Sequence, residues 1–187
     1  MSDPARLPGA GPATFVDATS QPSEAPARYP AIRVCGDCTA CCTVMGVVEL
    51  GKANYQRCLH ECGRCTIYEA RPSVCRTWSC GWLLGAIEGD ERRRPDRLGL
   101  MFNSEHLAGK PVTVAYEVWP GAGRQPNSKY LLGKMSQAAP IILRAYETRK
   151  CDVITPDPAT RESFRQLILQ EWVQKPGADW AECGYFD

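Results

Sequence analysis

The clearest alternation of apolar and polar residues lies between Val112 and Trp119. Valine and tyrosine at the even positions fall on one face, while threonine, alanine, glutamate and tryptophan at the odd positions fall on the other. A period of two residues is typical of a β-strand. Shorter apolar runs predict two further strands, at Leu98–Phe102 and at Cys151–Thr155, the second of them buried.

Two stretches in the C-terminal half of the chain repeat apolar residues at helical spacing. Ser128–Arg149 is predicted to be helical, with Pro140 either kinking the helix or marking a second start. Asp157, followed by a proline, indicates the start of another helix, which ends before Pro176. The inner face of this helix is predicted to consist of Phe164, Leu167, Ile168 and Trp172.

The N-terminal half of the chain contains only short apolar patterns. Val44–Leu50 is an apolar run that fits a strand or the start of a helix, and Lys52–Arg57 is expected to form a helical turn. Thr66–Ala70 resembles the start of a helix, and Ser73 is expected to cap a second short helix. The apolar stretch Trp82–Glu88 is predicted to pack this region onto the back half of the chain.

These patterns divide the chain into three parts. Residues 1–30 contain six prolines and six alanines and are predicted to be a disordered leader, with a proline-rich recognition arm as the alternative. Residues 31–88 are a cysteine-cluster region expected to bind metal, and residues 89–187 are the C-terminal part of the same domain. We therefore expect an α+β fold, in which a small irregular, metal-stapled cysteine-cluster region packs on a small α/β layer.

Composition narrows the class of protein. The chain has 187 residues, and its 22 basic and 21 acidic residues leave a formal charge of +1, so nucleic acid is not the expected partner. No run of eighteen apolar residues and no signal-peptide core is present, so we expect no membrane partner and a cytoplasmic location. In that reducing compartment, clustered cysteines indicate metal ligands or catalytic thiols rather than disulfides.

Nine of the eleven cysteines lie between Cys35 and Cys80. The first four form a CxxCxxCC pattern, and five more follow within forty residues. Thiolates two residues apart on a tight turn can converge on one ion, at about 2.3 Å from zinc. Nearby arginines can offset the negative charge that several thiolates leave around one or two ions: Arg57, Arg64, Arg71 and Arg76.

The identity of the metal stays open between zinc and iron. Zinc favours tetrahedral sites of four thiolates. Iron favours a thiolate-held cluster, and the spacing of Cys35, Cys38 and Cys41 is that of the CxxCxxC triplet of bacterial ferredoxins, so an iron–sulfur cluster is possible. The side chains of the adjacent Cys41 and Cys42 diverge, which suggests that two centres share the region.

The segments CGDCTACC and CLHECGRCTIYEARPSVCRTWSC also resemble the YkgJ-type cysteine-cluster family, which is named for zinc or iron chelation. The resemblance covers about Cys35–Cys80, and the residues from Arg94 to Arg97 are similar to an RPDR element that often follows. It implies metal binding without implying a reaction. The ligands that it implies are Cys35, Cys38, Cys41, Cys42, Cys58, Cys65, Cys75 and Cys80.

Other candidates receive a structural interpretation. Cys62 is additional to the family pattern, and His60 lies in the same loop, so a ligand role stays open for both. Cys151 and Cys183 are interpreted as a small hydrophobic residue or a surface thiol. We expect Tyr68 and Trp78 to pack around the site, and Arg71 and Pro72 to fix a turn between ligand-bearing segments. His106 is left unassigned.

Three functions compete at this point. The first is a metal-binding protein in which zinc or iron staples the domain or serves as its functional centre. The second is an oxidoreductase that transfers electrons through an iron–sulfur centre. The third is a zinc-stapled module that contacts protein or nucleic acid through Arg92–Arg94, although a solvated loop is the simpler interpretation of that run. No GxSxG, HExxH or P-loop pattern assigns a catalytic residue.

Overall fold

The fold is built on a β-hairpin whose two strands are the longest of the sheet. Strand β1 (Leu100–Leu107) pairs antiparallel with β2 (Lys110–Glu117), and Ala108 and Gly109 join them with φ of 49° and 75°. Positive φ at both loop residues is the pattern of a type I′ turn, which matches the twist of the flanking strands. The structure is a computed structural model that describes residues 33–146, 148, 150–174, 182 and 183.

Three further strands extend the hairpin into a five-stranded mixed sheet with the order β1-β2-β3-β4-β5. Strand β3 (Ile141–Arg144) runs parallel to β2, and β4 (Lys150–Ile154) runs antiparallel to β3. The two-residue β5 (Glu182–Cys183) lies parallel to β4. Helices and a mixed sheet together confirm the predicted α+β class, and the predicted strands at residues 98–102, 112–119 and 151–155 are present with shifted ends.

Both faces of the sheet are covered, because consecutive residues of its strands enter two separate cores. The core on the cysteine side contains Ala40, Val44, Met101, Leu107, Val114, Tyr116, Ile142, Cys151, Val153 and Ile168. The core on the α4 side contains Trp82, Ile87, Leu98, Leu100, Phe102, Ala115, Leu131, Leu132, Ile141 and Leu143. Trp82 and Ile87 therefore pack against the hairpin, as predicted for residues 82–88.

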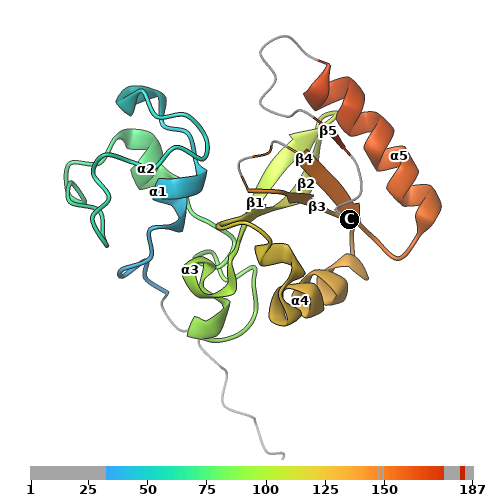
Figure 1. Ribbon diagram of the computed structural model, residues 1–187, viewed down its shortest axis with the longest axis horizontal. Coiled ribbons are helices and arrows are strands. Elements are labelled where there is room, and N and C mark those ends of the chain that lie inside the picture. The colour runs from blue at the N-terminus through green and yellow to red at the C-terminus, as the bar shows by residue number, and fades with distance from the viewer. Residues whose placement is uncertain (1–32, 147, 149, 175–181, 184–187) are drawn as a thin grey trace, which may run out of the picture. The chain divides into compact units, whose positions relative to one another are not determined.

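Two helices of eleven residues each flank the sheet on opposite sides (Figure 1). Helix α4 (Pro126–Ser136) ends well before residue 149, so the second half of the predicted helix 128–149 is wrong: Pro140 precedes the buried strand β3. Helix α5 (Pro158–Ile168) begins as predicted, and Asp157 caps it by accepting hydrogen bonds from the amides of Ala159 and Thr160. A π-helical segment, Leu169–Val173, continues it.

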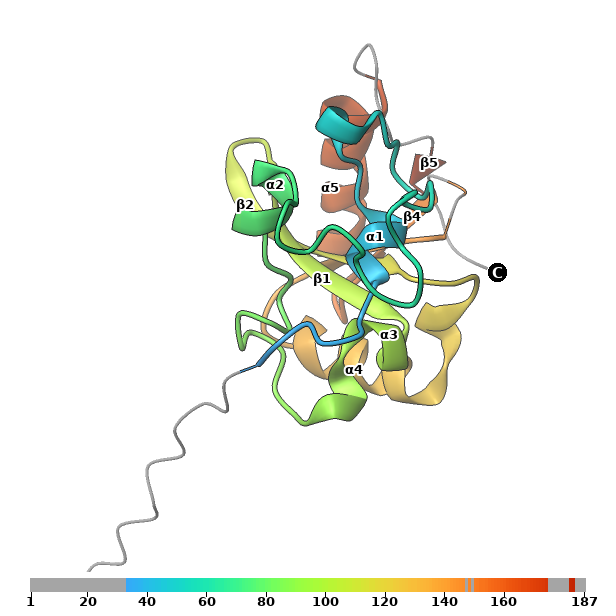
Figure 2. The ribbon, with the colours of Figure 1, turned by 90° about the vertical axis from the view of Figure 1, so that its left-hand side faces the viewer.

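The cysteine-bearing segments lie together on one side of the sheet, the side that faces the viewer in Figure 2. Their helices are short, because glycine, proline and closely spaced turns interrupt every run. The α-helices are α1 (Ala40–Val44), α2 (Ser73–Thr77) and α3 (Pro95–Leu98). The 3₁₀ turns are Val48–Leu50, Glu91–Arg93 and, beyond the hairpin, Ala122–Arg124.

Three local predictions in this region are wrong. Residues 52–57 form no helical turn, because Lys52 pairs with Val47 in an isolated bridge and Tyr55 has a positive φ of 59°. Residues 66–70 form turns rather than the start of a helix. Ser73 is the first helical residue of α2 rather than its cap, and Pro72 occupies the capping position without a side-chain hydrogen bond.

Two predictions about chain organisation are not tested. The predicted leader at residues 1–30 lies outside the described residues, and the boundary at residue 88 stays a prediction. Among the helices of the described part, none has the length and apolar character needed to cross a membrane.

Candidate metal centre

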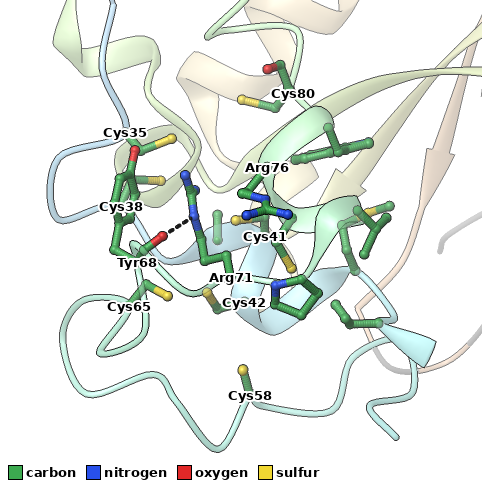
Figure 3. Close-up of a pocket in the computed structure, with 18 of the residues that line it drawn as sticks. Cys35, Cys38, Cys41, Cys42, Cys58, Cys65, Tyr68, Arg71, Arg76 and Cys80 are labelled. Carbon is green, nitrogen blue, oxygen red and sulfur yellow. Dashed lines mark hydrogen bonds between the residues drawn. The ribbon is translucent and has the colours of Figure 1, made fainter. Parts of the chain in front are cut away.

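The cysteine-bearing segments enclose a pocket of about 230 Å³ (Figure 3). All eight cysteines implied by the family pattern line it, and each is a free thiol. They come from segments up to 45 positions apart in the sequence: Cys35, Cys38, Cys41, Cys42, Cys58, Cys65, Cys75 and Cys80. The structure thus gathers the predicted residues at one place, while their role as ligands stays a prediction.

Backbone hydrogen bonds hold together the segment from Cys35 to Cys42 and the loop of residues 58–65. The amide of Cys38 donates to the carbonyl of Cys35 over 2.9 Å, a tight turn that places Gly36 at a φ of 56°. Helix α1 then carries Cys41 and Cys42. The amide of Cys58 donates to the carbonyl of Cys42 over 3.0 Å, which brings the loop of residues 58–65 against α1. Main-chain contacts thus bring these cysteine-bearing segments together.

A turn holds the segment that carries Cys75, and the sheet holds the segment that carries Cys80. Arg71 Nε donates to the carbonyl of Tyr68 over 2.8 Å, and its guanidinium lies 3.6 Å from the centre of the Tyr68 ring. Helix α2 follows at once and carries Cys75. After Cys80, the amide of Gly81 donates to the carbonyl of Phe102 in β1 over 2.8 Å. Arg71 therefore fixes the turn, as predicted, and β1 anchors the segment with Cys80.

Lys52 is a buried cation on the wall of the pocket, with 7% of its surface exposed. Its ammonium donates to the carbonyls of Met45, Thr43 and Ala53, the first two at the C-terminal end of α1. Burial lowers the Lys52 pKa, and the thiols of Cys58 and Cys42 act in the opposite direction. Nothing in the sequence singles out this lysine, because its position depends on carbonyls that converge only in the folded chain.

The adjacent thiols of Cys41 and Cys42 share a hydrogen bond, which shifts their pKa values in opposite directions. Donation by the Cys41 thiol lowers the pKa of Cys42 to about 7, with help from the charges of Lys52 and Arg71. The same hydrogen bond, followed by burial, raises the Cys41 pKa far above its ordinary value. Cys42 is therefore partly a thiolate near neutral pH, the form that attacks electrophiles and binds metals.

Cys38 lies on the wall of the pocket beside Asp96 of α3. Burial raises the pKa of Cys38 to about 12, while the backbone amides of Ala40 and Asp96 donate hydrogen bonds to its sulfur and act in the opposite direction. Amides aimed at sulfur are typical of the surroundings of metal-bound thiolates. They would stabilise the charged form once a cation replaces the proton.

The donor set of the pocket is dominated by sulfur. Beside the cysteines it includes the thioethers of Met45 and Met101, whereas its described lining contains no histidine, aspartate or glutamate. Sulfur-only sites suit zinc, copper(I) and iron–sulfur clusters. Within the described residues, however, no three cysteine, histidine or acidic side chains already stand close enough to hold an ion. The thiols would have to draw together around a bound metal.

The remaining candidates lie elsewhere. Cys62 is exposed and does not line the pocket, and neither does His60. Cys151 is fully buried in the core on the cysteine side, which confirms its interpretation as a small hydrophobic residue. The side chain of Cys183 lies outside the described residues. Trp78 lines the pocket and packs against the same core, as predicted.

The basic run 92–94 does not behave as one solvated loop or patch. Arg92 pairs with Asp90 at 2.8 Å, and Arg93 lies over the ring of Tyr130. Arg94 is buried, with 5% of its surface exposed, and faces Asp96 and Asp37. Sequence reasoning missed this burial, because three successive arginines carry no signal that separates the structural one.

Comparison with protein-family models, with curated proteins and with solved structures finds no match.

Proposed function

We propose that the protein is a thiolate metalloprotein that binds zinc or iron in the eight-cysteine pocket. The observation that carries the proposal is the convergence of Cys35, Cys38, Cys41, Cys42, Cys58, Cys65, Cys75 and Cys80 on one pocket, with the exposed Cys62 left outside. The same eight match the YkgJ-type pattern, and membership of that family is part of the proposal.

Electrostatics supports this assignment. Eight thiolates carry more negative charge than two divalent ions neutralise, so a loaded pocket needs further cations. Lys52, Arg71 and Arg76 line it, and the charge of Arg71 acts on the thiols of Cys35, Cys42 and Cys75. A cation buried beside thiolates is worth more than one in water, because the interior screens charge less. These residues would balance and orient the ligands around an ion.

A bound metal would supply either a structural cross-link or redox chemistry. Zinc has no redox chemistry and would tie the four segments together, since little regular secondary structure holds them. An iron–sulfur cluster would carry one electron at a time. Cys35 and Cys38 lie on one turn, and Cys41 follows at the start of α1. This ferredoxin-like triplet favours the electron-transfer alternative.

The third alternative, a zinc-stapled module that docks through Arg92–Arg94, loses support. Two of the three guanidinium groups are engaged within the chain, at Asp90 and in the buried network around Asp96. A nucleic-acid-binding protein is expected to have a contiguous basic surface, and residues 92–94 do not form one.

Anaerobic purification of the full chain, followed by metal analysis and a visible spectrum, tests the proposal. Stoichiometric zinc in a colourless protein supports the structural role. Iron with labile sulfide and broad absorption that bleaches with dithionite supports the redox role. A folded protein that carries neither metal, and takes up neither on reconstitution, refutes metal binding.

A further inference from the structure

We propose that the pocket holds two separate metal centres, and that the adjacent residues Cys41 and Cys42 belong to different ones. This inference rests on the proposed metal binding. The inner set, on the sheet side, is Cys35, Cys38, Cys41 and Cys80. The outer set, on the loop side, is Cys42, Cys58, Cys65 and Cys75.

Packing against the core distinguishes three of the four inner cysteines from the outer set. Cys38, Cys41 and Cys80 contact the core on the cysteine side, which the sheet and α5 complete. Among the described residues that pack there, none belongs to the outer set. In Figure 3, Cys35, Cys38 and Cys80 lie toward one end of the pocket and Cys42, Cys58 and Cys65 toward the other, with Cys41 between them. An inner centre would be shielded by the core and an outer one would sit nearer the surface.

Main-chain contacts within each set agree with the same division. The hydrogen bond from the Cys38 amide to the Cys35 carbonyl makes these two a single turn of the inner set. In the outer set, the amide of Cys58 donates to the carbonyl of Cys42, and Cys65 closes the same loop through a bridge with Glu61. These bonds link two members of the inner set and three of the outer set, and none of them joins one set to the other.

The electrostatic neighbours of the thiols agree with this geometry. Among the thiols, Cys80 of the inner set acts most strongly on Cys35, and Cys42 acts more weakly. The thiols that act on Cys75 are Cys42, Cys58 and Cys65, the other three members of the outer set. The sets are neighbours, and their closest approach is the hydrogen-bonded pair of Cys41 and Cys42.

Different surroundings explain why that pair is divided, although the two thiols are hydrogen-bonded to each other. Cys41 points toward the core, and Cys42 lies against the 58–65 loop. Because the two sulfurs face different groups of thiols, two adjacent ions can take one each.

Two double variants test the division with zinc as the probe. Cys35→Ser with Cys38→Ser removes half of the inner set, and Cys58→Ser with Cys65→Ser removes half of the outer set. We expect each variant to retain half of the zinc that the reconstituted full chain binds, and Cys62→Ser to retain all of it. A wild-type protein that binds a single zinc ion overturns the division, as does a folded double variant that loses all of its zinc.

A second measurement keeps the test decisive if a variant fails to fold. NMR of the wild-type chain loaded with magnetically active cadmium should give two resonances, each correlated with the β-protons of one set only. A resonance that correlates with both Cys41 and Cys42 contradicts the proposal. A wild-type chain that binds neither zinc nor cadmium refutes metal binding itself, so failure of the division and failure of the proposed function are distinct outcomes.

Discussion

Arg94, at the start of α3, reaches the carboxylate of Asp37 with a separation of 2.6 Å between Nη2 and Oδ1. The same guanidinium forms two parallel hydrogen bonds to Asp96, of 2.6 and 2.7 Å. Asp37 lies inside the turn between Cys35 and Cys38, so the bond ties this turn to α3. One arginine from the run that looks most solvated in the sequence thus positions the first two cysteines.

Replacement of Arg94 should destabilise the protein and loosen this turn. Arg94→Ala leaves Asp96 partly buried without its partner, and we expect a loss of about 3 kcal/mol in the free energy of unfolding. Arg94→Lys should recover only part of it, because an ammonium cannot form the bidentate pair. Urea denaturation of the metal-free protein measures both, with Arg92→Ala as the exposed control. Equal stability of Arg94→Ala and Arg92→Ala contradicts this role.

Lys52 should tune the affinity of the pocket for metal. Lys52→Met keeps most of the length of the side chain but removes the buried charge beside Cys42 and Cys58. We expect zinc binding at neutral pH to weaken about tenfold, the range found for residues that support metal ligands. Competition with a chromophoric chelator gives the affinity, and Lys110→Met, on an exposed strand end, is the control. An unchanged affinity for Lys52→Met shows that its charge does not act on the thiolates.

Cys42 should react at a lower pH than Cys38 in the metal-free, reduced protein. Its pKa of about 7 is below the ordinary value, so the thiolate forms as the pH rises through 7, while Cys38, with a pKa of about 12, stays protonated. Alkylation by iodoacetamide across pH 6–9, followed by peptide mapping, should show half-maximal labelling of Cys42 near pH 7. Half-maximal labelling of Cys42 at the ordinary pKa of a thiol refutes the shared hydrogen bond with Cys41.

Cys151 should matter for stability but not for metal binding. The residue is fully buried on β4, so Cys151→Ser places a hydroxyl in an apolar core and should cost about 1–2 kcal/mol. Zinc content should stay at the wild-type value. Cys62→Ser, at an exposed position, should change neither quantity. Loss of zinc from folded Cys151→Ser protein means that the ligand set is wrong.

The candidate site could be predicted from the spacing of the cysteines and from the family resemblance, since a CxxC turn and a short helix are local structures. Lys52 and Arg94 were missed because their roles arise from distant groups, the carbonyls of α1 and the carboxylate of Asp37. Strand β3 was missed for another reason. Its four residues are all buried, so they show no alternation, and they follow α4 closely enough to continue its apolar pattern.

X-ray absorption at the edge of the bound metal tests the central claim most directly. The account predicts a first shell made of sulfur only, about four per metal at about 2.3 Å, that is retained in Cys62→Ser. A first shell dominated by nitrogen or oxygen, or a metal that stays bound with an unchanged spectrum when the eight pocket cysteines are replaced by serine, would contradict it.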